Sequence, residues 1–248
     1  MAREFNGTNQ IYYSTTTPVT AAPLTLACWF YANDVTSSRA LLGVLNASVN
    51  NEYWLLFAAG ASVGDPVIFR ANTSAGAADA STTAGYTAGA WHHACGVGVS
   101  ATDRTVYLNG ANAGTSATSR TPSSVSRTSL AARDHTTTDL YFDGLLAEVG
   151  IWSAALGAAD VAALAKGMSP LLVRPDALAG YWPLRGKLSP EPDRLSGNEY
   201  ALFNTPTAGA HARVFMPAPV QVAFMYRGIA AGVQTTDVRL LLVLGVGL

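Results

Sequence analysis

The sequence predicts an all-β fold, an antiparallel sandwich or barrel with one short helix. Three observations support this prediction: short segments alternate between apolar and polar residues, Gly, Asn, Asp or Pro bounds each segment, and one stretch has a helical composition. Alternation places every second side chain on the same face of a strand. Many short strands joined by tight turns are typical of antiparallel architectures.

The predicted strands begin near the N-terminus and follow one another closely. In residues 23–32, PLTLACWFYA, alternate apolar residues share one face, and Trp29 and Tyr31 lie on the other. ALLGVLN, EYWLLFAAG and DPVIFRA follow at short intervals. AWHHACGVGVS and RTVYLNG come next, and Asn109-Gly110 at the end of the second suits a tight hairpin turn. SLAAR and LYFDGLLAEVGIW complete the series.

The predicted helix lies in SAALGAADVAALAKG, residues 153–167. Val161 and Leu164 are three residues apart and share a face, Asp160 is placed in the first turn where a negative charge suits the helix dipole, and Gly167 fits the position after the last turn. A segment punctuated by prolines follows the helix and carries one more apolar patch, ALAGYWPL. These features predict a β-rich protein with one short helix after the main series of strands.

Composition and charge exclude several classes of function. The chain has 248 residues, a formal net charge of -1, 12% charged residues and no cluster of lysines and arginines, which disfavours nucleic-acid binding. We expect no export signal, because the N-terminal residues lack an apolar core. A membrane helix needs about 20 apolar residues, and no stretch reaches that length. Cys28 and Cys95 are expected to be two buried thiols, with one disulfide as the alternative.

Four stretches resemble the laminin-G-like branch of the concanavalin A-like jelly rolls. They are FNGTNQIYYS, PLTLACWFYA, AWHHACGVGVSATDRTVYLNGANAGT and LYFDGLLAEVGIWSAALGAADVAALAKG. The resemblance implies an antiparallel two-sheet jelly-roll sandwich over residues 1–213, with a core at 3–167 and a return segment at 168–213. The return segment, with LAGYWPL and DRLSGNEYAL, resembles an element that accompanies such domains and is expected to supply a further strand. Residues 214–248 are expected to form a separate apolar β extension.

The family contains lectins, glucanases, adhesion modules and virion proteins, so the fold leaves the function open. A laminarinase-like glycosidase needs two carboxylates on one strand in an E-x-D-x-x-E arrangement. Glu148 is the nearest candidate, but Gly150 and Trp152 occupy the positions where its partners would be. Alternation places His93 on an inward face with Cys95 and Val97, so His93 is expected to be a buried histidine and not a metal ligand. We therefore expect no enzymatic activity.

The resemblance also implies that calcium can bind at the rim of the sandwich. The loop ARDHTTTDLYFDG offers Asp134, Asp139 and Asp143, and YANDV offers Asn33 and Asp34. Carboxylate, amide and backbone oxygens are the ligands that Ca²⁺ prefers. The alternative is that these aspartates only form turns, in which case the chain has no cofactor.

A sugar site would use exposed aromatic rings beside such polar groups. The candidates are Tyr53, Trp54 and Tyr86. The alternative for each is a place in the core or on a sheet face.

The C-terminal extension contains two apolar segments, VQVAFMYRG and DVRLLLVLGVGL. The second is apolar on both faces, as a strand covered on both sides would be, and it would be prone to aggregation if left open. It either inserts into its own domain or pairs with a neighbouring chain, and we expect the second. The residues predicted to mediate assembly are Val220, Val222, Phe224, Tyr226, Leu240, Leu242, Leu244 and Val246.

Two functions remain open. The first is a non-enzymatic structural or decoration protein on the surface of a phage head or tail, which assembles with itself or with other virion proteins. The alternative is a free-standing, extracellular glycan-binding module that depends on calcium or acts without it. The sequence does not determine the glycan, the symmetry of an assembly, the position on head or tail, or the host.

Overall fold

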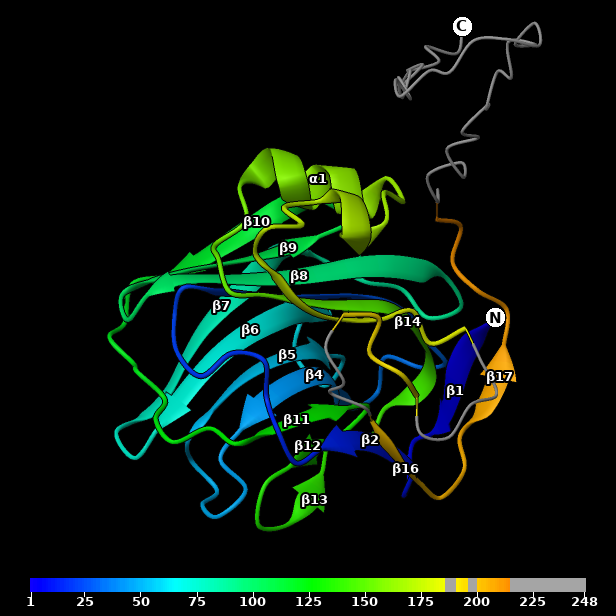
Figure 1. Ribbon diagram of the computed structural model, residues 1–248, viewed down its shortest axis with the longest axis horizontal. Helices are drawn as coiled ribbons and strands as arrows, with labels where there is room; N and C mark the ends of the chain where they lie inside the picture. Colours follow the sequence, from blue (N-terminus) through cyan, green and yellow to red (C-terminus); the bar gives the residue numbers. More distant parts are fainter. Residues whose placement is uncertain (186–190, 196–199, 215–248) are drawn as a thin grey trace, which may run out of the picture. The chain divides into compact units, whose positions relative to one another are not determined.

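The computed structural model describes residues 1–185, 191–195 and 200–214. Two large antiparallel sheets pack face to face in this part of the chain (Figure 1). The prediction of an all-β sandwich is confirmed, and α1 (Ala158–Ala165) is the single α-helix among the described residues. A short 3₁₀ turn, η1 (Pro170–Leu172), follows it.

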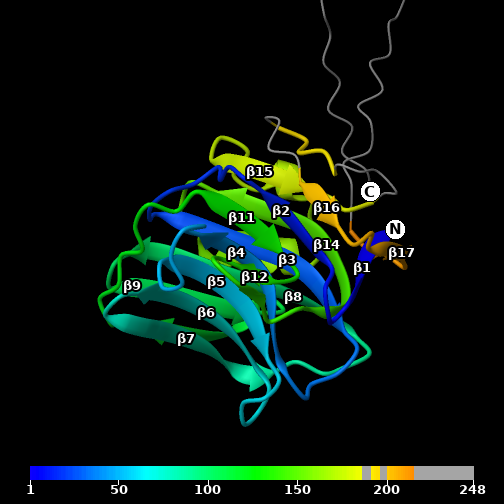
Figure 2. The same cartoon turned by 90° about the horizontal axis from the view of Figure 1, so that it is seen from below.

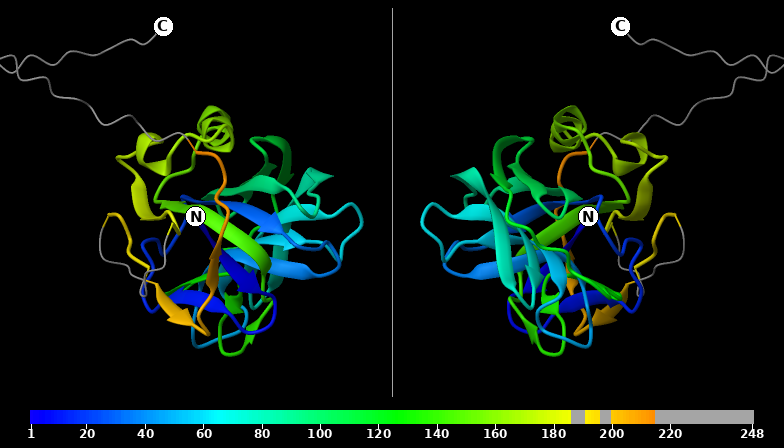
Figure 3. Two further views of the ribbon diagram at one scale, coloured as in Figure 1. Left: turned by 90° about the vertical axis from the view of Figure 1, so that its right-hand side faces the viewer. Right: turned by 90° about the vertical axis from the view of Figure 1, so that its left-hand side faces the viewer.

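The eight-stranded sheet combines strands from both ends of the described chain. Its order is β10 (Ala111–Ser116), β9 (Asp103–Leu108), β8 (Trp91–Ser100), β3 (Leu24–Ala32), β14 (Asp143–Trp152), β1 (Ala2–Asn6) and β17 (Thr207–Gly209), and β15 (Leu178–Trp182) also pairs with β14. Figure 3 shows β1 and β17 side by side at the N-terminus.

The seven-stranded sheet forms the opposite layer, and Figure 2 shows its strands side by side. Its order is β16 (Ala201–Phe203), β2 (Ile11–Ser14), β11 (Arg127–Leu130), β4 (Ser38–Leu45), β5 (Tyr53–Ala59), β6 (Pro66–Thr73) and β7 (Gly76–Gly85). A small hairpin of β12 (Arg133–Asp134) and β13 (Thr138–Asp139) follows β11.

The main core lies between the two sheets and follows from the alternation in the sequence. Leu26, Cys28 and Phe30 of β3 point into it and meet residues such as Phe69 of β6 from the facing sheet. Gly96 of β8 lies opposite Phe69, and a β-carbon at that position would come within 2.5 Å of the phenylalanine ring. The glycine therefore allows the two sheets to approach each other at this point.

A second apolar cluster lies on the outer face of the eight-stranded sheet. Cys95 and Val97 of β8 and Trp152 of β14 pack there against Val161 and Leu164 of α1. The indole nitrogen of Trp152 donates a hydrogen bond of 2.8 Å to the carbonyl of Val173. The helix predicted from the sequence thus covers one part of this outer face.

The structure corrects the expected orientation of the face of β8 that carries His93 and Cys95. The alternation in AWHHACGVGVS placed His93 with Cys95 on an inward face, but this face points away from the main core, towards α1 and the outside. His93 is nevertheless buried, as expected. Cys28 and Cys95 are free and buried on opposite faces of the sheet, which confirms the expectation of two thiols. Burial raises the pKa of both.

The described residues of the return segment include three short strands, where the sequence predicted one. β15 pairs with β14, β16 with β2 and β17 with β1. The predicted assembly residues of the C-terminal extension, from Val220 to Val246, lie outside the described residues, and the prediction about them stays open. In the part of the chain that the structure covers, no helix is long and apolar enough to cross a bilayer.

Candidate functional site on the open face of the eight-stranded sheet

Helix α1 leaves part of the outer face of the eight-stranded sheet uncovered. Beyond the cluster under the helix, the same face carries Trp29 and Tyr31 of β3 and Trp91 of β8, and each of these side chains is partly exposed. The edge strands β1 and β17 lie away from α1 in Figures 1 and 3. Partly exposed aromatic side chains on an uncovered sheet face indicate a surface suited to binding.

Strand register aligns five residues across this face. Trp91 is the partner of Tyr31, Tyr31 of Leu145, Leu145 of Glu4, and Glu4 of Thr207. We call these five residues the aromatic row. Side chains directly opposite each other on neighbouring strands lie about 5 Å apart at their β-carbons, so the row is a continuous strip across five strands.

The contacts within the aromatic row hold its side chains in place. The rings of Tyr31 and Trp91 meet edge to face with their centroids 5.9 Å apart. The hydroxyl of Thr207 donates a hydrogen bond of 2.9 Å to Oε2 of Glu4. The row therefore offers two aromatic rings at one end and a positioned carboxylate at the other.

A second row lies next to the aromatic row on the side of the helix. Trp29 packs against His93 with ring centroids 5.4 Å apart, and the backbone N–H of His93 donates to Oδ1 of Asn109. Burial lowers the pKa of His93 to about 3. His93 is therefore uncharged at neutral pH and packs edge to face with the Trp29 ring.

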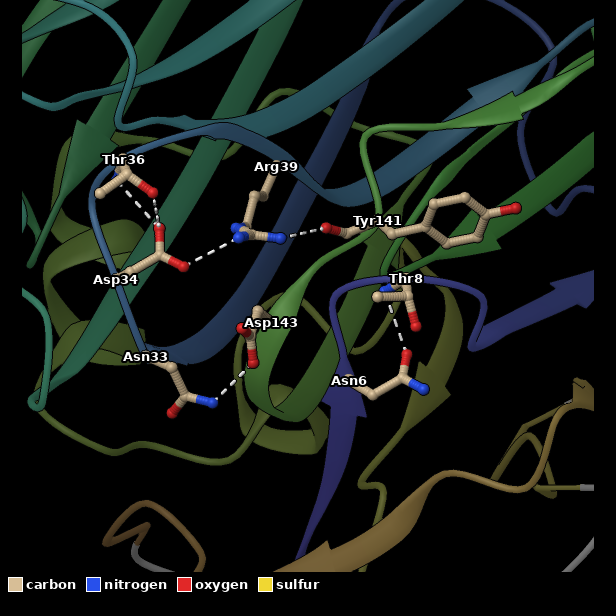
Figure 4. A network of polar contacts seen from close by, with 8 residues as sticks. All are labelled: Asn6, Thr8, Asn33, Asp34, Thr36, Arg39, Tyr141 and Asp143. Carbon is tan, nitrogen blue, oxygen red and sulfur yellow. Dashed lines mark hydrogen bonds and ion pairs between the residues drawn. The ribbon is translucent and has the colours of Figure 1, made fainter.

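Polar side chains border the aromatic row on the other side, at the rim of the sandwich (Figure 4). Nδ2 of Asn33 donates to Oδ1 of Asp143 over 2.7 Å. Asn6, which is the register partner of Asp143, accepts a hydrogen bond from the backbone N–H of Thr8. Asn33 lies two residues beyond Tyr31 along the chain, and Asp143 lies two residues before Leu145, the register partner of Tyr31.

An arginine occupies the centre of the rim network. Arg39 donates from Nη2 to Oδ2 of Asp34 over 2.8 Å and from Nη1 to the carbonyl of Tyr141 over 2.9 Å (Figure 4). Burial alone would raise the pKa of Asp34, but hydrogen bonds from Thr36 and Arg39 outweigh it and hold that pKa below its usual value. Asp34 is therefore a stable carboxylate with a fixed partner.

The predicted calcium ligands do not come together. Asp134 pairs with Arg127 over 2.7 Å, Asp139 is held by both nitrogens of the Arg133 fork, and Asp143 belongs to the rim network. Among the described residues, no group of three or more His, Cys, Asp and Glu side chains could hold a metal ion. The prediction of a site formed by these three aspartates is wrong, because arginines neutralise two of them.

The rim residues Asn33 and Asp34 do not fit calcium either. The carboxylate of Asp34 and the nearby carbonyl of Tyr141 accept hydrogen bonds from Arg39, and the amide of Asn33 donates to Asp143. A guanidinium in this place supplies the positive charge that a cation would bring. The guanidinium of Arg39 therefore already engages the carboxylate of Asp34 and the carbonyl of Tyr141.

The three aromatic residues predicted to bind sugars lie in the interior. Tyr53, Trp54 and Tyr86 are 2%, 2% and 3% exposed. Trp54 and Tyr86 belong to the main core. Tyr53 lies beneath Arg133, whose Nη1 donates to the tyrosine oxygen over 2.9 Å. Their rings cannot stack on a sugar from solvent, so the prediction is wrong and the alternative given with it, core or sheet face, is correct.

The sequence contained a signal for the residues that were missed. Trp29 and Tyr31 share the face of β3 opposite to Leu26, Cys28 and Phe30, which is the face that the structure leaves partly open. The sequence did not indicate which part of that face the helix covers.

The chain matches a family model described as the concanavalin A-like lectin/glucanases superfamily over residues 5–162. No curated protein matches the chain.

Solved structures with a similar fold include proteins whose names refer to carbohydrates. A putative carbohydrate-binding protein from Bacteroides ovatus has a TM-score of 0.59 at 16% identity, over 84% of this chain and 61% of that one. Domain 4 of an arabinanase from Geobacillus stearothermophilus, in complex with arabinotriose, has a TM-score of 0.55 at 20% identity, over 66% and 76%. The carbohydrate-binding module of a Ruminococcus gnavus sialidase, bound to α2,3-sialyllactose, has a TM-score of 0.54 at 11% identity, over 66% and 96%.

Proposed function

Because the chain belongs to the concanavalin A-like lectin/glucanase superfamily, we propose that it is a non-enzymatic module that binds glycans on the aromatic row. The observation that carries the proposal is the alignment of Trp91 and Tyr31 with Glu4 on an open sheet face. The carbohydrate-binding proteins of similar fold support the same class of function.

The chemistry of the row suits a sugar ring. The C–H groups on one face of a pyranose are weakly positive and pack against the negative face of an aromatic ring. Its hydroxyl groups then need hydrogen-bond partners around the edge of that contact. The amide of Asn33 and the carboxylate of Asp143 lie beside Tyr31, and the Glu4 carboxylate lies farther along the row, beyond Leu145. A few placed polar groups beside an apolar surface are the usual means by which a protein orients a small ligand.

The carboxylates of the chain do not favour hydrolysis. Glu148, the candidate closest to a glycosidase motif, is buried and receives a hydrogen bond from the hydroxyl of Tyr181. The general acid of a glycosidase is a carboxyl group whose pKa is raised by its surroundings. Glu4 lies on the aromatic row but is exposed to solvent, which is an unsuitable environment for that role. Binding without catalysis is therefore the function that the geometry supports.

Alanine substitution of the two rings tests this proposal. Trp91→Ala and Tyr31→Ala should each weaken binding to a glycan identified on an array by about tenfold or more, because each removes one stacking surface. Isothermal titration would measure the loss. Tyr13→Ala is the matched control, because Tyr13 is also partly exposed but lies on the other sheet beneath Arg127. A wild-type chain that binds no glycan on the array, or equal losses in all three variants, would refute the proposal.

The role in a phage virion predicted from the sequence stays a prediction. It depends on assembly through the C-terminal extension, which lies outside the described residues. Glycan binding and virion assembly use different parts of the chain and are compatible.

A further inference from the structure

The charged side chains of the aromatic row and of the two rows beside it have a single sign. The row and the two rows beside it contain the carboxylates of Glu4 and Asp143 and no lysine or arginine. The register positions that define these three rows are Trp91, Tyr31, Leu145, Glu4 and Thr207; His93, Trp29 and Ala147; and Asn33, Asp143 and Asn6. His93 is the histidine of these rows. It is uncharged at neutral pH, because burial lowers its pKa to about 3.

The nearest arginines along the chain do not offset this charge. Arg3 precedes Glu4 on β1 and faces the interior, where it lies over the ring of Tyr12 and pairs with Glu191 over 3.3 Å. Arg39, at the rim, is bound to Asp34 and to the carbonyl of Tyr141. Both guanidinium groups are therefore committed to partners within the chain.

The two carboxylates are arranged to accept hydrogen bonds from a ligand. Thr207 donates to Oε2 of Glu4, and Asn33 donates to Oδ1 of Asp143. Each contact fixes one oxygen of the carboxylate and leaves the lone pairs of the second oxygen for a further donor. Sugar hydroxyls and ammonium groups are such donors, whereas carboxylate and sulfate groups have acceptors only.

We propose that the aromatic row selects uncharged and amino-bearing sugars and discriminates against glycans that carry carboxylate or sulfate groups. The inference rests on the proposed function and specifies its substrate class. An acidic group placed against the row would meet two carboxylates of like charge, and each such contact opposes binding. Together they should weaken the binding of an acidic glycan by about tenfold or more relative to its uncharged form.

A glycan array that presents uncharged, amino-bearing, sialylated and sulfated forms of the same backbones tests the inference. The uncharged and amino-bearing forms should bind at least about tenfold more tightly than the acidic forms at low salt, and the difference should narrow as salt screens the charges. Glu4→Gln and Asp143→Asn should each reduce the discrimination while keeping a polar side chain of the same shape. Asp103→Asn is the control, because Asp103 is an exposed carboxylate at the start of β9, outside the three rows.

The outcomes separate the inference from the proposed function. Acidic forms that bind as tightly as their uncharged counterparts, or a discrimination that Asp103→Asn reduces as much as Glu4→Gln does, would overturn the inference and leave glycan binding intact. Absence of binding to every glycan would overturn both. Self-association of the chain that Tyr31→Ala abolishes, without glycan binding, would show that a second copy occupies the row, and would also overturn both.

Discussion

At the scale of single residues, Arg39 decides how the rim of the sandwich is held. Its guanidinium joins the carboxylate of Asp34 to the backbone carbonyl of Tyr141 and thus connects two loops that are about a hundred residues apart in sequence. A β-carbon on Gly7 would lie 2.8 Å from Nη1 of Arg39, so the glycine, at a φ of 71°, leaves room for the arginine. A cation supplied by the chain makes a bound metal ion unnecessary here.

The first prediction of this scale concerns calcium. The melting temperature of the wild-type chain should not change between excess Ca²⁺ and EDTA, because Arg39 already engages the oxygens at the rim. Arg39→Met should lower the free energy of unfolding by about 1–3 kcal/mol, because it removes two hydrogen bonds that the charged guanidinium donates to oxygen. Thermal and urea unfolding would measure both effects.

The control for Arg39→Met is Arg174→Met. Arg174 pairs with Asp176 on the exposed surface, where such ion pairs contribute little to the free energy of unfolding. The pH dependence adds a check. The pKa of Asp34 is lower in the folded chain than in the unfolded chain, so the stabilisation by its partners is present above about pH 4 and is lost as the pH falls through the folded pKa. A melting temperature of the wild-type chain that rises with Ca²⁺ would contradict the claim that Arg39 engages the rim oxygens in place of calcium.

At the scale of secondary-structure elements, a bulge in β14 anchors the return segment. The register of β14 against β3 shifts between Ala147 and Gly150, and Glu148 within this bulge adopts a φ of 51°. Its buried carboxylate accepts a hydrogen bond from Tyr181 of β15 and lies 3.1 Å from Nη2 of Arg185 and 3.2 Å from Nε2 of His211. The carboxylate of Glu148 thus contacts three residues of the return segment, Tyr181, Arg185 and His211.

The prediction at this scale is that Glu148→Ala destabilises the fold by about 2–4 kcal/mol, because it leaves the hydroxyl of Tyr181 buried without this acceptor and removes the partner of two basic side chains. Glu148→Gln should cost less, because its carbonyl oxygen can still accept from Tyr181. Urea unfolding gives the free energies, and limited proteolysis shows whether cleavage concentrates in residues 183–214. Equal stability of the alanine variant and the wild type would rule out the anchoring role.

At the scale of the whole molecule, the two sheets differ in what covers their outer faces. Helix α1 packs on Cys95, Val97 and Trp152 and stops short of Tyr31 and Trp91. On the other sheet, the β12–β13 hairpin places Arg133 over Tyr53. The partly open face of the eight-stranded sheet therefore carries aromatic rings and acidic groups together, which is the arrangement on which the proposed function rests.

The prediction at this scale concerns assembly, which the sequence assigns to the C-terminal extension. The full-length chain should be oligomeric, and deletion of residues 217–248 should leave a folded monomer, because the deletion removes the apolar segments expected to pair between chains. Light scattering would measure the mass, and circular dichroism would confirm the fold of the shortened chain. A shortened chain that remains oligomeric would exclude the extension as the assembly element.

Much of the fold follows from local patterns in the sequence. Alternation predicted which side chains of β3 enter the core, the Asn109-Gly110 pair predicted the β9–β10 turn, and Ala-rich spacing around Val161 and Leu164 predicted α1. These predictions succeed because a period of two or of 3.6 residues is a property of a few consecutive residues. The resemblance of four stretches to laminin-G-like domains predicted the superfamily whose family model the chain matches.

The candidate site could not be predicted in the same way. Alternation shows that a strand has two faces, but whether Tyr53 is covered by Arg133 or Trp91 is left partly open depends on segments far away in the chain. Glu4 and Thr207 are 203 residues apart, yet they are neighbours in the aromatic row. The sequence by itself therefore determined the strands, the helix and the faces of β3, and tertiary structure decided which outer face is covered and which is left partly open, because burial of an outer face results from packing between distant segments.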